Sequence, residues 1–202
     1  MSGLRATLEN LLDDVAEPTP ELLSSMAQQV QRLSRLVTDL LDLARFEAGA
    51  IPLHRGLADL RQLFADAVSD LEFRHPRAIV EWGVTKTDPI WIDPERMHQV
   101  LANLLDNAVH HGGGNAVSLS ASSSNGGLQL AVTDNGPGIT PADIDRIFHR
   151  FHQGDGTTGG TGLGLAISRW IVELHGGSTR AEPVHPHGMR IVVELPLEEP
   201  SL

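Results

Sequence analysis

Apolar residues in the N-terminal part of the chain recur at alternating steps of four and three, the repeat of helices that pack side by side. They occupy one face of residues 4–16 and, after Pro18-Thr19-Pro20, one face of a longer helix: Leu4, Leu8, Leu11 and Val15, then Met26, Val30, Leu33, Val37, Leu40 and Ala44. This pattern predicts a helical hairpin. We expect a second copy to cover its apolar face in a homodimeric four-helix bundle; the alternative is that the hairpin packs on the rest of the chain.

After Glu47-Ala48-Gly49, where glycine ends the second helix, strand and helix patterns alternate. We expect strands at 51–54, 79–81, 90–92, 117–121, 128–133, 178–182 and 191–195, and helices at 57–71, 94–111, 140–148 and 165–175. Asp93-Pro94 and the pair Thr140 and Asp143 are helix-start signals. Asn125-Gly126-Gly127 predicts a hairpin turn. The fold class is therefore α+β, a helical hairpin followed by a two-layer α/β sandwich whose helices cover one face of a mixed sheet.

The helix at 94–111 carries two asparagines one turn apart, away from its apolar stripe. That stripe comprises Met97, Val100, Leu101, Leu104, Leu105 and Ala108. Asparagine is a poor helix former because its amide competes for backbone groups, so Asn103 and Asn107 require an explanation. An amide oxygen can ligate Mg²⁺, and an amide NH₂ can donate to phosphate. The alternative is a solvated polar face.

Two glycine-rich segments follow this helix. In Asp134-Asn135-Gly136-Pro137-Gly138 a strand ends in a carboxylate beside a turn with little side-chain bulk, which suits an exocyclic amine such as that of adenine. Gly160-Thr161-Gly162-Leu163-Gly164 leads into a helix, where backbone N–H groups and the helix dipole favour phosphate. Neither segment alone is specific, since turns are rich in glycine. With the asparagine helix, in this order, they predict a nucleotide pocket.

These segments resemble the asparagine box, first glycine box, phenylalanine box and second glycine box of sensor histidine kinases. The matching residues are Asn103-Leu104-Leu105-Asp106-Asn107-Ala108, Asp134-x-Gly136-x-Gly138, Ile147-Phe148-x-x-Phe151 and Gly160-x-Gly162-x-Gly164-Leu165, continuing through His175-Gly176-Gly177 to Gly188 and Leu195-Pro196. Residues 32–45 are similar to the end of the family's dimerisation domain. The resemblance covers essentially the whole chain. It implies a dimerisation and phosphoacceptor hairpin at 1–49 and a Bergerat-type ATP-binding catalytic domain at 50–202.

The resemblance implies ATP and Mg²⁺ as ligands and assigns roles by position. Asn103 resembles a Mg²⁺ ligand and Asn107 a phosphate contact, and both are expected to be catalytic. Asp134 would hold the adenine amine, and residues 152–161 would form a lid over the nucleotide. The expected ATP-binding set is Asn107, His110, His111, Asp134, Gly136, Gly138, Ile139, Phe148, Arg150, Gly160, Thr161, Gly162, Leu163, Gly164 and Leu165. Phe148 is expected in the core, and Phe151 outside it.

One departure from the family lies shortly after the second asparagine, Asn107. Many members have Lys-Tyr there, and this chain has His110-His111. A neutral His110 would lack the positive charge that lysine directs toward phosphate, whereas the ring of His111 would still stack beside adenine. Nucleotide binding is therefore expected to be weaker or pH-dependent. The alternative is that both rings are surface residues, favourable at a helix C-terminus through its dipole.

A second departure concerns the phosphoacceptor. The family places its acceptor histidine near the start of the first helix, but no histidine precedes His54 here. The chain is therefore expected to be a fragment whose acceptor lies upstream of Met1, and to be unable to phosphorylate itself. In the complete protein, the implied reaction transfers the γ-phosphate of ATP to that histidine and then to an aspartate of a response regulator receiver domain.

Three other functions share parts of the pattern. An anti-sigma-factor serine kinase would have the pocket but not the long helix with its heptad repeat. ATP hydrolases such as gyrase and the ninety-kilodalton heat-shock chaperones have a glutamate at the position of Asn103, where it activates water. A non-catalytic nucleotide-binding or dimerisation module stays open because the acceptor histidine is absent.

The composition of the chain indicates its general class of protein. Hydrophobic residues make up 41% of the 202 positions, which is typical of a globular protein. A formal net charge of −11 argues against a nucleic-acid surface. The chain has no cysteine, which is compatible with a reducing cytoplasm. No apolar run approaches the roughly 18 residues of a membrane span. We therefore expect a cytoplasmic region, with any membrane anchor of a parent sensor outside this chain.

Overall fold

The computed structural model describes residues 2–13, 15, 17–47, 52–85, 89–112, 116–124, 127–141, 143–152 and 162–197. The chain divides into two compact units, Met1–Ala50 and Ile51–Leu202. Each has its own architecture. None of the described helices combines the length and the apolar character needed to cross a bilayer.

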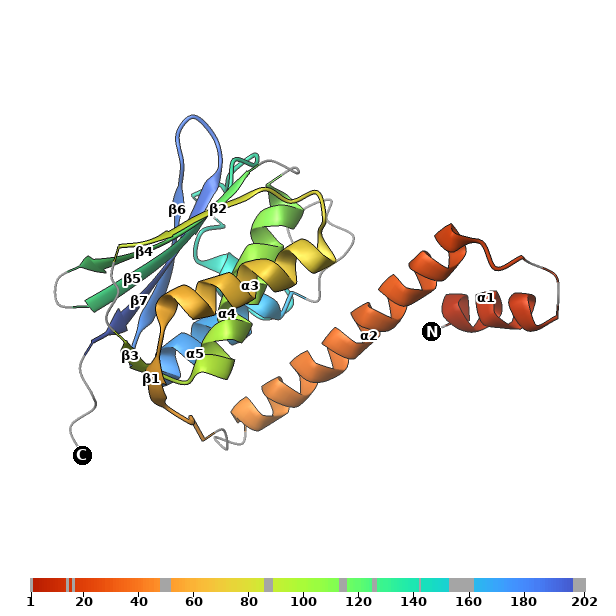
Figure 1. Ribbon diagram of the computed structural model, residues 1–202, viewed down its shortest axis with the longest axis horizontal. Coiled ribbons are helices and arrows are strands. Elements are labelled where there is room, and N and C mark those ends of the chain that lie inside the picture. The colour runs from red at the N-terminus through yellow and green to blue at the C-terminus, as the bar shows by residue number, and fades with distance from the viewer. Residues whose placement is uncertain are drawn as a thin grey trace. The chain divides into compact units, whose positions relative to one another are not determined.

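The first unit consists of two helices, α1 (Ser2–Leu12) and α2 (Pro20–Glu47) (Figure 1). Several apolar side chains on and between these helices are exposed, namely Leu8, Leu12, Val15, Leu23, Val30, Val37 and Leu41. The side chains of Leu4 and Leu40, which belong to the predicted stripe, lie outside the described part. Exposed apolar side chains that recur along a helix are a surface suited to another helix.

The second unit is built on a five-stranded sheet with the strand order β2-β4-β5-β7-β6. Its strands are β2 (Val80–Val84), β4 (Val117–Ser124), β5 (Gly127–Thr133), β6 (Ser178–Pro183) and β7 (Met189–Pro196). Strands β2 and β4 are parallel, whereas the other neighbours are antiparallel. The sheet is therefore mixed, as predicted. A separate antiparallel pair joins β1 (Gly56–Ala58) to β3 (Ile90–Ile92).

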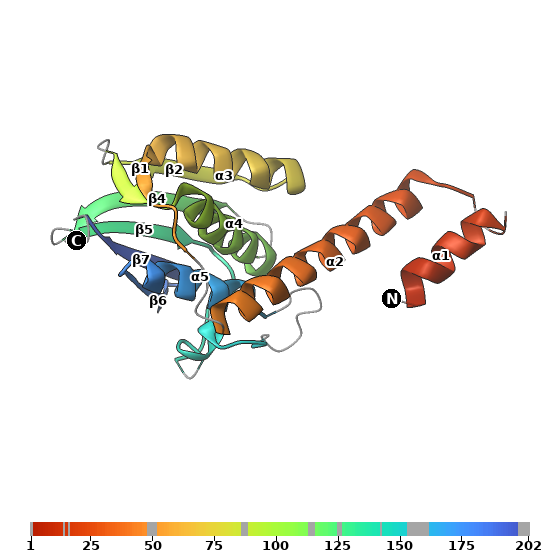
Figure 2. The same ribbon diagram turned by 90° about the horizontal axis from the view of Figure 1, so that it is seen from below.

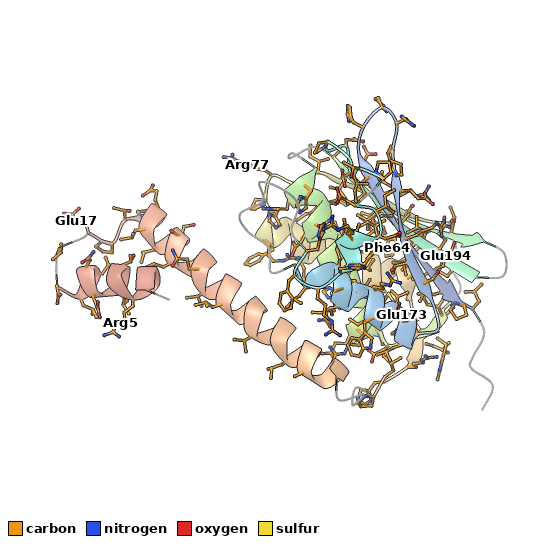
Figure 3. All side chains as sticks on the ribbon, turned by 180° about the vertical axis from the view of Figure 1, so that it is seen from behind. Arg5, Glu17, Phe64, Arg77, Glu173 and Glu194 are labelled. Atoms are coloured by element: carbon orange, nitrogen blue, oxygen red, sulfur yellow. The ribbon has the colours of Figure 1, made fainter. Side chains whose placement is uncertain are left out.

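Three helices cover one face of the sheet: α3 (Leu60–Arg74), α4 (Pro94–His111) and α5 (Gly164–Leu174) (Figures 1 and 2). Side chains alternate along the strands, so Leu128, Leu130 and Val132 of β5 are buried. Phe64 of α3 is fully buried (Figure 3). Its ring and the Trp82 ring of β2 meet in a T-shaped arrangement, with ring centroids 6.3 Å apart. The predicted two-layer α+β architecture is confirmed.

The predicted strand at 51–54 is wrong. Residues 52–55 have no strand, residue 51 lies outside the described part, and β1 begins at Gly56. The reason is that the His54 N–H donates to the Asp93 carboxylate (N···Oδ2, 2.8 Å) instead of to a neighbouring strand. The next helix also begins later than expected, at Leu60, because the Asp59 carboxylate accepts from two backbone N–H groups of its first turn.

The predicted helix at 140–148 is reduced to one short 3₁₀ helix, η1 (Arg146–Phe148). The Thr140 hydroxyl donates to the Asp143 carboxylate at 2.6 Å, so the two expected capping side chains bind each other. They do not cap the backbone N–H groups of a long helix. The hairpin turn at residues 125 and 126 and most of the predicted lid, residues 153–161, lie outside the described part.

Candidate functional site

Helix α4 presents both asparagines, and Asn103 is tied to the start of α5. Its Nδ2 donates to the Gly164 carbonyl oxygen at 3.2 Å and approaches Ser168 Oγ at 3.4 Å. Ser168 is fully buried, and its hydroxyl donates to the same carbonyl at 2.9 Å. Because these protein acceptors take the amide NH₂ of Asn103, the amide oxygen is the atom left for a ligand.

Asn107 lies one turn further along α4 and is half-buried. No described residue forms a hydrogen bond with its side-chain amide. Asn103 and Asn107 are four residues apart and therefore lie on the same side of the helix. Together they provide an oriented amide oxygen and a second amide that retains both donor and acceptor capacity.

Asp134 follows the end of β5 and is 4% exposed. Its Oδ1 accepts from the Gly136 N–H at 2.8 Å and from the Met189 N–H at 3.3 Å. Its own N–H donates to the Met189 carbonyl oxygen at 2.9 Å. Both of these carboxylate bonds go to one oxygen, so the backbone orients the group and leaves Oδ2 available to accept from an amine.

Glycines bring the Asp134 segment against the C-terminus of α4. A Cβ at Gly136 would lie 2.4 Å from the His111 carbonyl oxygen, and one at Gly112 would lie 2.4 Å from the Ala108 carbonyl oxygen. A Cβ at Gly188 would lie 2.2 Å from the Asp134 carbonyl oxygen. No side chain fits at these positions, so the close approach of three backbone segments requires glycine.

His110 and His111 end α4 beside Asp134. His110 is exposed, His111 is half-buried, and their rings meet edge to face with centroids 5.0 Å apart. Burial lowers the pKa of His111, the neighbouring His110 lowers it further, and Asp134 raises it. The half-buried ring of His111 is therefore biased toward its neutral form.

The second glycine segment forms the entry to α5. The Phe151 N–H donates to the Gly162 carbonyl oxygen at 2.8 Å, and Gly162 has a φ of +69°, which favours glycine. Leu163 is buried, and among the residues that the structure describes no side chain caps the helix that begins at Gly164. Backbone N–H groups at such a helix start are the arrangement that binds phosphate in other proteins.

The remaining predicted residues differ in how far they are buried. Phe148 is buried, with the Arg169 guanidinium 5.8 Å from its ring centroid, and Phe151 is 64% exposed. Both observations agree with the sequence prediction. Ile139 and Leu165 are half-buried, Arg150 is exposed, and Gly138 has a positive φ of 83°. Gly160 and Thr161 lie outside the described part.

Three residues that were not predicted from the sequence as part of the site also shape it: Ser168, Gly112 and Gly188. Ser168 lies four residues after Gly164, so the helical repeat indicated that it shares the face that Gly164 begins. Gly112 directly follows the predicted helix, at a usual position for a helix stop. Gly188 belongs to the stretch that resembles the family, but no local signal ties it to the site, because its role depends on contact with Asp134, which is distant in sequence.

The arrangement therefore combines three chemical features. A buried carboxylate offers one oxygen to an amine, an amide oxygen on α4 is suited to a hard cation, and an uncapped helix start is suited to phosphate. The side chain at position 103 is an amide, which cannot take a proton from water as a general base does.

Models of known protein families match residues in both units of the chain. Residues 92–199 match the model described as histidine kinase-, DNA gyrase B-, and HSP90-like ATPase. Residues 1–49 match the His Kinase A (phospho-acceptor) domain.

Among curated proteins, the probable sensor histidine kinase TcrY of Mycobacterium tuberculosis is 39% identical over 199 residues, covering 95% of this chain and 41% of that protein. The signal transduction histidine-protein kinase BaeS of Escherichia coli is 33% identical over 214 residues, covering 98% and 44%. The chain thus spans about two fifths of the length of these relatives.

Solved structures with the same architecture include the histidine kinase AdeS of Acinetobacter baumannii, with a TM-score of 0.78 and 26% identity over 97% of this chain and 94% of that chain. Full-length ShkA in complex with AMPPNP has a TM-score of 0.77 and 30% identity over 97% and 43%.

Proposed function

The chain belongs to the sensor histidine kinase family and carries its ATP-binding domain, and on that premise we propose that Asp134, Asn107, Asn103 and the start of α5 bind ATP with Mg²⁺ in the catalytic region of a protein-histidine kinase. The complex of the related ShkA with AMPPNP supports a nucleotide in this fold. The adenine amine donates to Asp134, and the phosphates lie toward Asn107 and the first turn of α5.

The geometry of Asp134 is the observation that carries this proposal. A carboxylate that is 4% exposed needs a partner for each oxygen, because burial of an unpaired charge is costly. The Gly136 and Met189 N–H groups bind Oδ1, and an exocyclic amine is the partner that Oδ2 would take. His111 is half-buried and lies close enough to Asp134 for the carboxylate to raise its pKa. Its ring would lie beside the base.

The residues present also fit Mg²⁺. This cation prefers oxygen ligands and is commonly held by one or two protein groups together with substrate phosphates and water. The amide oxygen of Asn103 is such a group, since Gly164 and Ser168 orient its nitrogen. In the described part of the chain, no group of three or more His, Cys, Asp or Glu side chains could hold a metal by itself. Mg²⁺ bound here would neutralise charge on the phosphates.

In the whole protein, we propose that the γ-phosphate passes to the imidazole of a histidine and then to an aspartate of a response regulator receiver domain. Phosphoryl transfer depends mainly on positioning and charge neutralisation, and a neutral imidazole is already a nucleophile near neutral pH. The amide at position 103 fits this reaction better than hydrolysis, because it cannot activate water. We place this region in the cytoplasm, where both ATP and a response regulator are available.

Calorimetric titration of ATP with Mg²⁺ tests the site. We expect saturable binding by the chain and its loss in Asn107→Ala and in Asp134→Ala. Asp66→Asn is a matched control, because Asp66 is an exposed carboxylate on α3 that accepts from the Gln62 side chain. Equal affinities for the native chain and Asp134→Ala would exclude the proposed adenine contact.

Transfer is tested by adding a separate polypeptide that bears the acceptor segment of a related histidine kinase. Phosphate that appears on its histidine with the native chain, and not with Asn103→Ala, supports the kinase. ATP binding without any transfer would favour a nucleotide-binding module.

A further inference from the structure

Two polar residues are buried at the ends of α4 and α5 that lie away from the asparagines. Asp93 and His175 are each 3% exposed. The Asp93 N–H donates to His175 Nε2 at 3.0 Å, and His175 Nδ1 donates to the Ile171 carbonyl oxygen at 2.7 Å. Because Nε2 accepts a hydrogen bond, the ring is neutral, and it links the N-terminus of α4 to the C-terminus of α5.

The first described segment of the α/β unit binds both of these helix ends. Asp93 Oδ1 caps α4 by accepting from the Arg96 N–H at 3.1 Å, while Oδ2 accepts from the His54 N–H at 2.8 Å. The Arg55 Nη2 donates to the Leu174 carbonyl oxygen at 2.7 Å, at the C-terminus of α5. A cation is also favourable at that helix end.

The same two helices are joined a second time at the candidate site, where Asn103 Nδ2 donates to the Gly164 carbonyl oxygen. At a rise of 1.5 Å per residue, the path from Asp93 to Asn103 is about 15 Å, and the path from Gly164 to His175 is about 16 Å. The helices are thus antiparallel, and the stretches between the two connections have nearly equal lengths. Neither helix can slide along the other without breaking one of the two connections.

We propose that His175 and Arg55 are positioning residues for the nucleotide pocket, which set the register of α4 against α5 from the end opposite Asn103 and couple that register to the backbone at His54. The inference rests on the proposed function of the pocket. Coupling between sites is reciprocal, so nucleotide that holds Asn103 and the first turn of α5 in register also protects the His54 N–H.

The first test compares two arginines in the full chain. Arg55→Ala removes the bond to Leu174, and Arg61→Ala removes a similar guanidinium bond to a backbone carbonyl, from Nη2 to the Val84 oxygen at 3.3 Å. Calorimetry with AMPPNP and Mg²⁺ is expected to show roughly fivefold or greater loss of affinity for Arg55→Ala, the lower range of coupling between distant sites. Arg61→Ala is expected to bind as the native chain does.

The second test replaces His175 in two ways and measures amide hydrogen exchange at His54 with and without AMPPNP and Mg²⁺. His175→Gln keeps an oxygen that accepts from the Asp93 N–H, whereas His175→Phe keeps a ring without an acceptor. We expect nucleotide-dependent protection in the native chain and in His175→Gln. In His175→Phe this protection is lost, a change that lower stability alone does not produce in a variant that still melts cooperatively.

Unchanged affinity in Arg55→Ala, or exchange at His54 that is the same with and without nucleotide in the native chain, would overturn the positioning role. If His175→Phe does not fold, the affinity of Arg55→Ala by itself decides the proposal. Failure of the native chain to bind AMPPNP is a distinct result, which overturns the proposed function and this inference together.

Discussion

Individual residues in the candidate site are oriented by backbone groups. Asp134 is held by two N–H groups on one oxygen, and Asn103 is held by its nitrogen, so each keeps a defined oxygen for a ligand. Such orientation costs little when the ligand binds, because the entropy of ordering the side chain is already lost on folding. The glycines around Asp134 make this possible by letting backbone segments meet.

Gly136→Ala is expected to destabilise the fold by about 1–3 kcal/mol, the usual cost of overpacking. The added Cβ would lie 2.4 Å from the His111 carbonyl oxygen and 3.0 Å from Asp134 Oδ1, and backbone cannot yield as a flexible side chain does. The free energy of unfolding measured by chemical denaturation checks this. Gly83→Ala is the control, since a Cβ there meets nothing within 4 Å. Equal destabilisation by both substitutions would contradict the argument.

At the scale of elements, the pocket depends on how α4 and α5 meet. Each helix is amphipathic, and its apolar face packs against the sheet and its neighbours. Apolar packing alone leaves the position along the helix axis loosely defined, because leucine and valine contacts are not directional. The hydrogen bonds of Asn103 and His175 are directional and select one register.

His175 also makes stability depend on pH. Burial lowers its pKa below the ordinary 6.5, the Ile171 carbonyl raises it, Arg55 lowers it and Asp93 raises it. With the folded pKa below the unfolded one, the neutral ring stabilises the fold fully above about pH 6.5, and this contribution is lost as the pH falls through the folded pKa. The pKa of the half-buried His111 is also lowered, so its neutral ring adds to the same loss of stability as the pH falls.

The free energy of unfolding is therefore expected to fall between pH 7.5 and pH 5.5 in the native chain and to fall less in His175→Gln, which does not titrate there. Denaturant unfolding at the two pH values checks this expectation. His187→Gln serves as the control, because the His187 side chain is exposed. A pH dependence in His175→Gln as steep as in the native chain would disprove the assignment.

At the scale of the whole molecule, the two units differ in how completely they bury apolar surface. In the α/β unit, helices cover the apolar face of the sheet, and the other face carries polar residues such as Gln129, Arg180 and Glu194, which interact with one another. Figure 3 shows Glu194 on this sheet. In the helical unit, apolar side chains are exposed along α2 at a helical spacing, including Val30, Val37 and Leu41. Association is therefore expected to reside in the helical unit.

The chain is expected to form a dimer whose dissociation constant rises about tenfold or more in the double variant Val30→Glu, Val37→Glu, because two charges per copy would be buried in the interface. Sedimentation equilibrium over a range of concentrations measures this change. Ser24→Glu adds one charge at an exposed position of α2, on the side of the helix away from the apolar stripe, and is expected to leave the dimer intact. A native chain that is monomeric at every accessible concentration would refute the prediction.

Much of the fold was predictable from local patterns. The helix at 94–111, its Asp93 cap and the mixed sheet follow from apolar periods and start signals. The elements predicted wrongly are short ones, at 51–54 and 140–148. There the local signal was outweighed by one long-range bond, from His54 to Asp93, and by one unforeseen side-chain pair, Thr140 with Asp143.

The sequence by itself determined the chemical types at the pocket, since two asparagines one turn apart, a carboxylate after a strand and two glycine segments are local features. Only the tertiary structure decided which atoms remain available. It assigned the nitrogen of Asn103 to Gly164, one oxygen of Asp134 to Met189, and His175 to Asp93. These are contacts between distant segments, and such contacts depend on packing the whole unit, which no local period encodes.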